Sequence, residues 1–201
     1  MSELTARAKV QLRRRARATR LALSREALDA RSALIVERVA GTRSFTAARS
    51  VALFWPLLDR GEVDLRALDR AARASGKLVY YPFLERNGDR ARTGFRLTRS
   101  SEELVPRGER FAEPPLDAPE AQRGDIDLVV VPALAASSNG DRLGYGLGFY
   151  DATLPDVCPP AEALVVVYDF ELLAELPTGP SDVPCGLVAT DLRMFERSVQ
   201  C

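Results

Sequence analysis

The sequence contains no histidine among its 201 residues. This absence excludes serine and cysteine nucleophiles that depend on a histidine base, and it excludes zinc sites with histidine ligands. The three cysteines, Cys158, Cys185 and Cys201, are an odd number without metal-ligand spacing, which fits a reducing cytoplasm. Any bound metal is therefore expected to have oxygen ligands, which favours Mg²⁺. Phosphoryl transfer is the reaction class that runs on carboxylates, Lys, Arg, backbone amides and a bound ion.

Long apolar runs and an excess of one charge are also missing. No run approaches the ~18–20 residues of a membrane-spanning helix, and no signal-peptide core follows Met1. We therefore expect a cytoplasmic protein without a membrane partner. Lys plus Arg and Asp plus Glu both total 28, which argues against a bulk polyanion such as a nucleic acid. Residues 7–20 are an exception, because they are rich in Arg and contain no acid.

Helix and strand signals alternate in the first half of the chain. Residues 4–22 predict a basic helix, and a second helix is expected from its N-cap Ser24 to Gly41. Short apolar segments predict strands at residues 51–55 and 77–81. The expected apolar stripe of the first helix comprises Leu4, Ala8, Leu12, Ala16 and Leu23. Between these strands a further helix is expected, with Asp64 as its cap and Gly76 at its end, and Pro82 is expected to close the second strand. A strand, a helix and a second strand in succession predict a parallel sheet.

A second α/β stretch follows residues 105–124, which are rich in Pro, Gly and charge and predict a surface connection. Residues 126–131 are almost continuously apolar, as in a central parallel strand. Further strands are expected at residues 164–168 and 187–190. The sequence therefore predicts an α/β fold of the Rossmann-like kind, a single three-layer domain over residues 1–201 with a mostly parallel sheet covered by helices.

The strongest local signal is a glycine-rich stretch at residues 139–151, NGDRLGYGLGFYD. It lies beyond the carboxyl end of the central strand, where open α/β sheets place ligands. Gly144, Gly146 and Gly148 allow positive φ and let backbone N–H groups approach an anion, while Arg142 suits phosphate oxygens. The spacing matches neither the dinucleotide fingerprint nor a P-loop. On glycine spacing alone, a tight turn that lets a strand pack on a helix fits equally well.

Residues 132–151 resemble the hallmark of the 5-formyltetrahydrofolate cyclo-ligase family, in which Gly-x-Arg-Leu-Gly-x-Gly-x-Gly precedes two aromatic residues and Asp. The resemblance implies nucleotide contacts from Arg142, Gly144, Gly146, Gly148 and Tyr150. It places Tyr145 and Phe149 beside the folate. It also implies that Asp151 is a Mg²⁺ ligand.

A second patch, Lys9-Val10-Gln11-Leu12-Arg13, matches the family's Lys-x-x-Leu-Arg. On a helix, Lys9 and Arg13 project from one side and can clamp a phosphate, and the resemblance implies that both contact ATP. A solvated basic face, a nucleic-acid-binding arm and an Arg-rich transit peptide are the alternatives that this patch leaves open.

Two further patches complete the resemblance. Trp55-Pro56 and Gly61-Glu62-Val63-Asp64 match family segments, and the resemblance implies that Glu62 binds the pterin and that Trp55 packs against its ring. Glu62 is also suited to a helix dipole and Trp55 to the core. Residues 176–183, LPTGPSDV, match the segment that supplies a second Mg²⁺ ligand, here Asp182, although they also suit a surface turn.

The resemblance implies an ATP- and Mg²⁺-dependent ligase that converts 5-formyltetrahydrofolate to 5,10-methenyltetrahydrofolate, with small-molecule partners. The sequence carries no signal of oligomeric state. Departures from the family pattern occur at Ala136, Leu147, Gly179 and Ser181. They leave open a related ATP-dependent ligase with another substrate, and a non-catalytic nucleotide-binding protein. The basic helix leaves open a nucleic-acid-binding protein.

Overall fold

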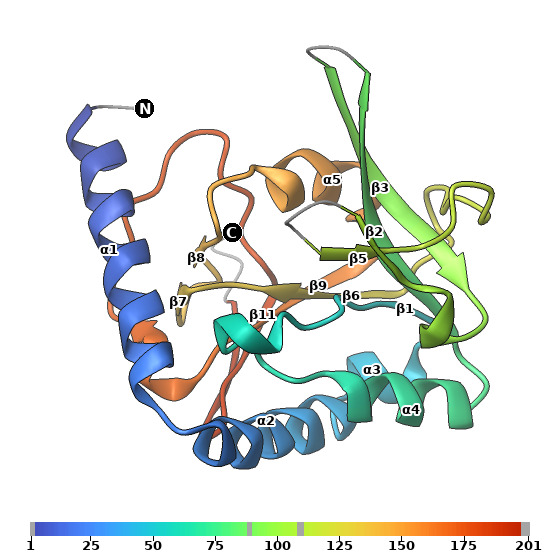
Figure 1. The fold of residues 1–201 in the computed structure, drawn as a ribbon, viewed down its shortest axis with the longest axis horizontal. Helices are drawn as coiled ribbons and strands as arrows, with labels where there is room; N and C mark the ends of the chain where they lie inside the picture. Colours follow the sequence, from blue (N-terminus) through green and yellow to red (C-terminus); the bar gives the residue numbers. More distant parts are fainter. Residues whose placement is uncertain (1–2, 88–89, 108–110, 198–201) are drawn as a thin grey trace.

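A computed structural model describes residues 3–87, 90–107 and 111–197 of the chain (Figure 1). A seven-stranded sheet runs through the described residues in the order β12-β11-β9-β6-β1-β2-β3. Neighbouring strands from β11 to β2 are parallel, whereas β12 and β3 are antiparallel edge strands. The strands are β1 (Ser50–Ala52), β2 (Leu78–Asn87), β3 (Arg90–Thr98), β6 (Leu128–Pro132), β9 (Glu162–Val166), β11 (Leu187–Ala189) and β12 (Met194–Glu196). The predicted mostly parallel α/β sheet is confirmed.

Helices cover both faces of this sheet and one of its ends. In Figure 1, α2 (Arg25–Ala40), α3 (Arg43–Ala47) and α4 (Arg66–Ala74) lie on one face and α5 (Phe149–Val157) on the other. The long helix α1 (Glu3–Ala22) stands across the end of the sheet, near the point where β6 finishes. Among the helices of the described ranges, none is long and apolar enough to cross a membrane.

The remaining elements are short. They are η1 (Leu58–Arg60), η2 (Ser101–Glu103), β4 (Val105–Arg107), β5 (Phe111–Glu113), β7 (Ala135–Ser137), β8 (Arg142–Leu143), η3 (Asp169–Glu171) and β10 (Leu172–Leu173). The predicted connection at residues 105–124 therefore contains the antiparallel pair β4–β5. Helix α5 begins at Phe149, at the end of the glycine-rich stretch.

Two apolar cores sandwich the sheet because successive strand residues point to opposite faces. On β6, Leu128 and Val130 pack toward α2 and α4, whereas Val129 and Val131 pack toward α5. Since both faces are covered, the central strands are apolar at nearly every position, which explains why the sequence reads as continuous apolar runs there. Ser24 caps α2 by accepting the N–H of Ala27, as predicted.

The helix start at Asp64 was predicted to within one residue, and two strand boundaries were wrong. The N-cap position of α4 is Leu65, but the Asp64 carboxylate accepts the N–H of Arg66, the first residue of α4, at 3.0 Å and also pairs with the Arg66 guanidinium at 2.6 Å. The first strand ends at Ala52 rather than Trp55. The second strand does not stop at Pro82 but continues to Asn87. Because β1 pairs with β2 only as far as Tyr80, Pro82 has no strand beside it on that side that would require an N–H donor, and β2 continues there as the partner of β3.

The predicted apolar stripe of α1 was wrong at its amino end, where Leu4 is 79% exposed. The buried residues of α1 are Lys9 and Arg20. The other residues of that stripe, Ala8, Leu12, Ala16 and Leu23, are half-buried, so the predicted face is turned inward. Its two buried positions carry charge because they face the carboxylates of Asp182 and Glu171.

Candidate active site

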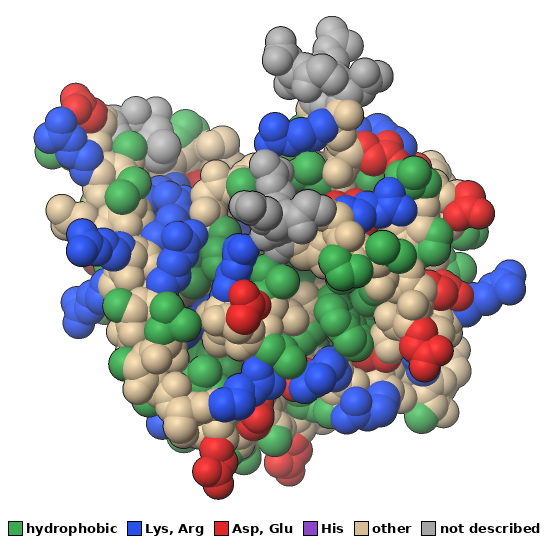
Figure 2. Space-filling model, viewed as in Figure 1, with side chains coloured by type: hydrophobic (Ala, Val, Ile, Leu, Met, Phe, Trp, Pro, Cys, Tyr) green, Lys and Arg blue, Asp and Glu red, His purple; other side chains and the backbone are tan. Residues whose placement is uncertain are grey.

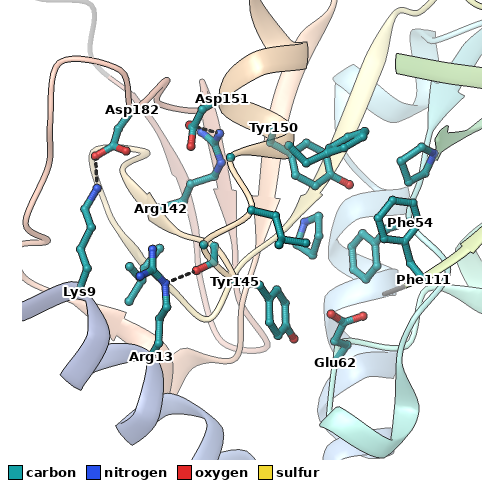
Figure 3. Close-up of a pocket in the computed structure, with 18 of the residues that line it drawn as sticks. Lys9, Arg13, Phe54, Glu62, Phe111, Arg142, Tyr145, Tyr150, Asp151 and Asp182 are labelled. Atoms are coloured by element: carbon teal, nitrogen blue, oxygen red, sulfur yellow. Dashed lines mark hydrogen bonds and ion pairs between the residues drawn. The ribbon is translucent and has the colours of Figure 1, made fainter. Parts of the chain in front are cut away.

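A cavity of about 430 Å³ opens between α1, the segment after β1 and the glycine-rich loop (Figure 3). Every residue that the sequence assigned to ATP, folate or Mg²⁺ lines this cavity. The carboxyl ends of β1 and β6 lead directly into its wall at Phe54 and Pro132. This position is the one where open α/β sheets place ligands.

One end of the cavity is charged. The Lys9 ammonium contacts the Asp182 carboxylate at 2.5 Å, and an Arg142 Nη contacts Asp151 at 2.6 Å. The Arg13 Nε donates to the Gly144 carbonyl at 2.9 Å. These contacts bring α1, the glycine-rich loop and the segment around residue 182 together, although they are far apart in the sequence (Figure 3).

Lys9 and Arg20 are the two buried cations of α1. Lys9 is 7% exposed, whereas the side chains of Arg7, Arg14, Arg15 and Arg17 face solvent. Figure 2 shows Lys and Arg side chains gathered on the side of the molecule that α1 forms. A solvated basic face therefore describes the outer side of this helix but not the side that carries Lys9.

The surroundings of Asp182 favour the ionised form of its carboxyl group. Burial alone would raise the pKa of its carboxyl group, but the Lys9 ammonium and the Gly179 N–H hold this pKa below its ordinary value. The Gly179 N–H donates to Asp182 at 2.7 Å. Although Gly179 departs from the family pattern, its backbone therefore helps to orient the carboxylate.

The loop glycines differ in their backbone φ angles and in the space around them for a side chain. Gly146 and Gly148 have φ of +96° and +67°, as predicted, but Gly144 lies outside the left-handed region, so that part of the prediction was wrong. A Cβ on Gly144 or Gly148 would meet no atom within 4 Å. Gly140 has φ of +85°, and a Cβ there would lie 1.9 Å from the Cys185 carbonyl oxygen.

Gly140→Ala is therefore expected to destabilise the protein by several kcal/mol, because the methyl group overlaps backbone and the left-handed φ disfavours alanine. The matched variant Gly144→Ala should change stability by less than about 0.5 kcal/mol while placing a methyl group against the ligand space. Thermal melting of both variants, followed by circular dichroism, checks this difference. Equal melting temperatures would contradict it.

The other end of the cavity is aromatic and carries one buried carboxylate. Phe54 and Phe111 line it together with Glu62, which is 7% exposed (Figure 3). A Glu62 oxygen accepts the Leu57 N–H at 2.8 Å. Burial raises the pKa of Glu62 above its ordinary value, although the Leu57 N–H and the Tyr145 hydroxyl act in the opposite direction. Glu62 lies before Leu65, the N-cap of α4, but its carboxylate is directed into the cavity.

The predicted aromatic contacts differ in exposure to the cavity. Trp55 is half-buried and meets Tyr81 edge-on, with ring centroids 6.2 Å apart. Phe149 is 7% exposed and packs edge-on against Phe95 at 6.0 Å, so most of its surface belongs to the core. Tyr150 directs its hydroxyl toward the aromatic end of the cavity (Figure 3).

Sequence reasoning missed Phe54, Phe111 and Leu57 as cavity residues. Phe54 was included in a predicted strand, and its position beyond the end of β1 is the signal that marks it as a ligand contact. Phe111 was assigned to a surface connection. Of the departures, Leu147 is half-exposed at the cavity, Ser181 lines it from an exposed position, and Ala136 is fully buried in β7 opposite Arg142.

Asp151 and Asp182 fit a Mg²⁺ ion that arrives with phosphate. The Val183 N–H donates to Asp151 at 3.2 Å, which places this carboxylate beside the residue that follows Asp182. No cluster of three or more His, Cys, Asp or Glu side chains suited to a metal occurs in the described ranges. Mg²⁺ commonly uses one or two carboxylates together with substrate phosphates and water, so this pair is a sufficient protein contribution.

The fold and this cavity define an α/β enzyme with a cationic, glycine-rich end for an anionic ligand and an aromatic end with a single carboxylate. The model of the 5-formyltetrahydrofolate cyclo-ligase family matches residues 5–191. The chain belongs to this family.

Individual relatives agree with the family assignment. A 5-formyltetrahydrofolate cyclo-ligase from Escherichia coli is 30% identical over 151 residues, covering 74% of this chain and 81% of the relative. One from Mycolicibacterium smegmatis is 45% identical over 80 residues, which span only 40% of this chain and 41% of that protein. The NMR structure of Aquifex aeolicus 5,10-methenyltetrahydrofolate synthetase superimposes with a TM-score of 0.79 at 26% identity, covering 96% of each chain.

Proposed function

We propose that this protein, acting as a single domain on small molecules in the cytoplasm, converts 5-formyltetrahydrofolate to 5,10-methenyltetrahydrofolate with the consumption of ATP and the release of ADP and phosphate. Family membership and the names of the relatives support the reaction. The assignment of this reaction to the cavity rests on the difference between its two ends, which we call the polarity of the cavity. Cations and loop amides occupy one end, and a buried carboxylate among aromatic rings occupies the other.

The charged end suits the triphosphate. Lys9, Arg13 and Arg142 carry the positive charge, and the open space over Gly144 and Gly148 lets phosphate oxygens approach the backbone. Fixed cations at a half-buried site stabilise the charge that develops as the γ-phosphoryl group is transferred. In the ligand-free protein, these cations are held by Asp182, Asp151 and the Gly144 carbonyl.

Mg²⁺ would be held by Asp151 and Asp182 together with phosphate oxygens. When bound, the ion neutralises phosphate charge. Lys9 and Arg142, which pair with these two carboxylates in the ligand-free protein, would then be available to the phosphates.

The aromatic end suits the pterin. A carboxylate accepts two adjacent N–H donors of a heterocycle in one plane, and Glu62 is the carboxylate directed into this end. Holding the ring there brings the formyl oxygen toward the triphosphate for attack on the γ-phosphorus. Nitrogen N10 of the folate then captures the activated carbon, and phosphate leaves. No protein nucleophile is required, in agreement with a chain that lacks histidine.

Mixing purified protein with 5-formyltetrahydrofolate, ATP and Mg²⁺ is expected to produce the near-ultraviolet absorbance of the methenyl product. Omitting ATP or Mg²⁺ should abolish the signal. ATP consumption with a different small acid, and none with 5-formyltetrahydrofolate, would replace this proposal with a related ligase. Binding of ATP without any turnover would replace it with a nucleotide sensor.

A further inference from the structure

Arg20 is a cation of α1 that belongs to none of the motifs. Its side chain is 1% exposed, and its guanidinium makes a bidentate pair with Glu171 at 2.5 and 2.8 Å. A further N–H donates to the Ala133 carbonyl, just beyond β6, at 2.5 Å. A charge buried to this degree is destabilising unless its donors are satisfied, and these contacts fix its position closely.

The remaining contact of this guanidinium leads toward the cavity. Its Nη1 donates to the Tyr145 hydroxyl oxygen at 3.1 Å. A guanidinium has donors only, so the Tyr145 oxygen is the acceptor and its single proton is free to point elsewhere. In Figure 3 the Tyr145 hydroxyl lies beside the Glu62 carboxylate at the aromatic end of the cavity. In this position the hydroxyl favours the ionised carboxylate and opposes the effect of burial, which raises the pKa of Glu62.

We propose that Arg20 is a positioning residue that acts through the Tyr145 hydroxyl to hold the Glu62 carboxylate charged and oriented for the folate ring. The role of this relay in folate binding rests on the proposed function. The relay itself, from Arg20 to Tyr145 to Glu62, does not, because in the ligand-free protein Arg20 already bonds to the Tyr145 hydroxyl and this hydroxyl lies beside the Glu62 carboxylate.

Neighbouring residues make room for Arg20 and hold the backbone of Glu62 in place. Gly61 has φ of +66°, and a Cβ there would lie 3.1 Å from the Cβ of Arg20, so this glycine leaves room for the arginine beside Glu62. The Tyr168 hydroxyl donates to the Glu62 carbonyl at 3.2 Å. The titratable or charged groups near the Glu62 carboxylate are Arg20 from α1, Arg60 from η1, Tyr145 from the loop and Tyr150 from α5, with Glu171 and Tyr168 behind Arg20.

The sign of the expected effect follows from these contacts. The Tyr145 hydroxyl and the Arg20 charge both favour the ionised form of Glu62 and oppose the upward effect of burial on its pKa. Removing either group should therefore move the Glu62 titration to higher pH. Since protonated Glu62 is a poorer acceptor for the folate ring, the Michaelis constant for the folate should rise at neutral pH while that for ATP stays constant.

The decisive measurement is the side-chain carboxyl ¹³C titration of Glu62 in the ligand-free protein, assigned by the loss of its signal in Glu62→Gln. Tyr145→Phe, which keeps the buried Arg20–Glu171 pair, is expected to raise the midpoint by about one pH unit. Arg20→Gln combined with Glu171→Gln removes both charges together, so that neither is left buried alone, and should raise it in the same direction.

Tyr81→Phe is the matched control, because it removes a buried hydroxyl that bonds to Asp69 instead. It should lower the melting temperature and leave the Glu62 midpoint unchanged. An unchanged midpoint in Tyr145→Phe would overturn the relay, and an unchanged midpoint in the double variant alone would remove Arg20 from it. Wild-type protein that forms no methenyl product, with the midpoint still shifted in Tyr145→Phe, would reject the proposed function and retain the relay.

Discussion

Arg142→Ala is expected to lower kcat for methenyl formation by about 100- to 1000-fold, the usual effect of losing one fixed donor at a developing oxyanion. The Arg142 side chain is 5% exposed and reaches the cavity from β8, within the glycine-rich loop. Its charge therefore acts in surroundings that solvent screens poorly. Steady-state absorbance kinetics at saturating ATP and folate measure the effect.

Two variants separate charge from structure in this experiment. Arg142→Lys keeps the charge but cannot contact Asp151 and the Val183 carbonyl as the guanidinium does, so partial activity is expected. Arg14→Ala removes an exposed cation from the outer side of α1 and should leave kcat unchanged. Turnover of Arg142→Ala at the wild-type rate, in protein with a wild-type melting temperature, would reject the assigned role.

Glu62→Gln is expected to lower kcat/KM for 5-formyltetrahydrofolate roughly 100-fold and to leave the Michaelis constant for ATP unchanged. The amide replaces one acceptor oxygen by an N–H₂ group, so a donor of the bound ring faces another donor in a buried site. The cations that would hold ATP lie at the opposite end of the cavity (Figure 3). Kinetics with each substrate varied in turn measure the two constants separately.

The pH dependence provides a second test of Glu62. Because burial raises the pKa of Glu62, wild-type kcat/KM should fall as pH decreases through this raised value, when the carboxylate gains a proton. Glu62→Gln should lack that acidic decline. Glu26→Gln, at an exposed position in the first turn of α2, is the matched control and should keep the wild-type profile. A wild-type Michaelis constant for folate in Glu62→Gln would show that this carboxylate does not bind the ring.

Much of the site was predictable because its motifs follow strand ends. The glycine-rich stretch comes after β6, and Glu62 comes shortly after β1. Parallel neighbours in a sheet bring their carboxyl ends to one edge, so a correct order of strands already places these motifs together. Lys9 and Arg13 were linked to them by the family resemblance, and the structure places both at the same cavity.

The parts that were missed depend on tertiary contacts without a local signal. The long β2–β3 hairpin was hidden because Pro82 normally marks the end of a strand, and only the short length of β1 permits it here. Arg20 resembles the neighbouring exposed arginines in sequence, and its burial depends on Glu171, far along the chain. Apolar periodicity located the inward face of α1, but it could not show that the two buried residues of this helix are charged.

A crystal structure of the protein with ADP, Mg²⁺ and 5-formyltetrahydrofolate would examine the polarity of the cavity directly. We expect the phosphates to lie within hydrogen-bonding distance of Arg13 and Arg142, and the pterin ring to lie against the Glu62 carboxylate. Phosphates bound among Phe54 and Phe111, or a pterin ring bound away from Glu62, would contradict the proposed arrangement of the two substrates.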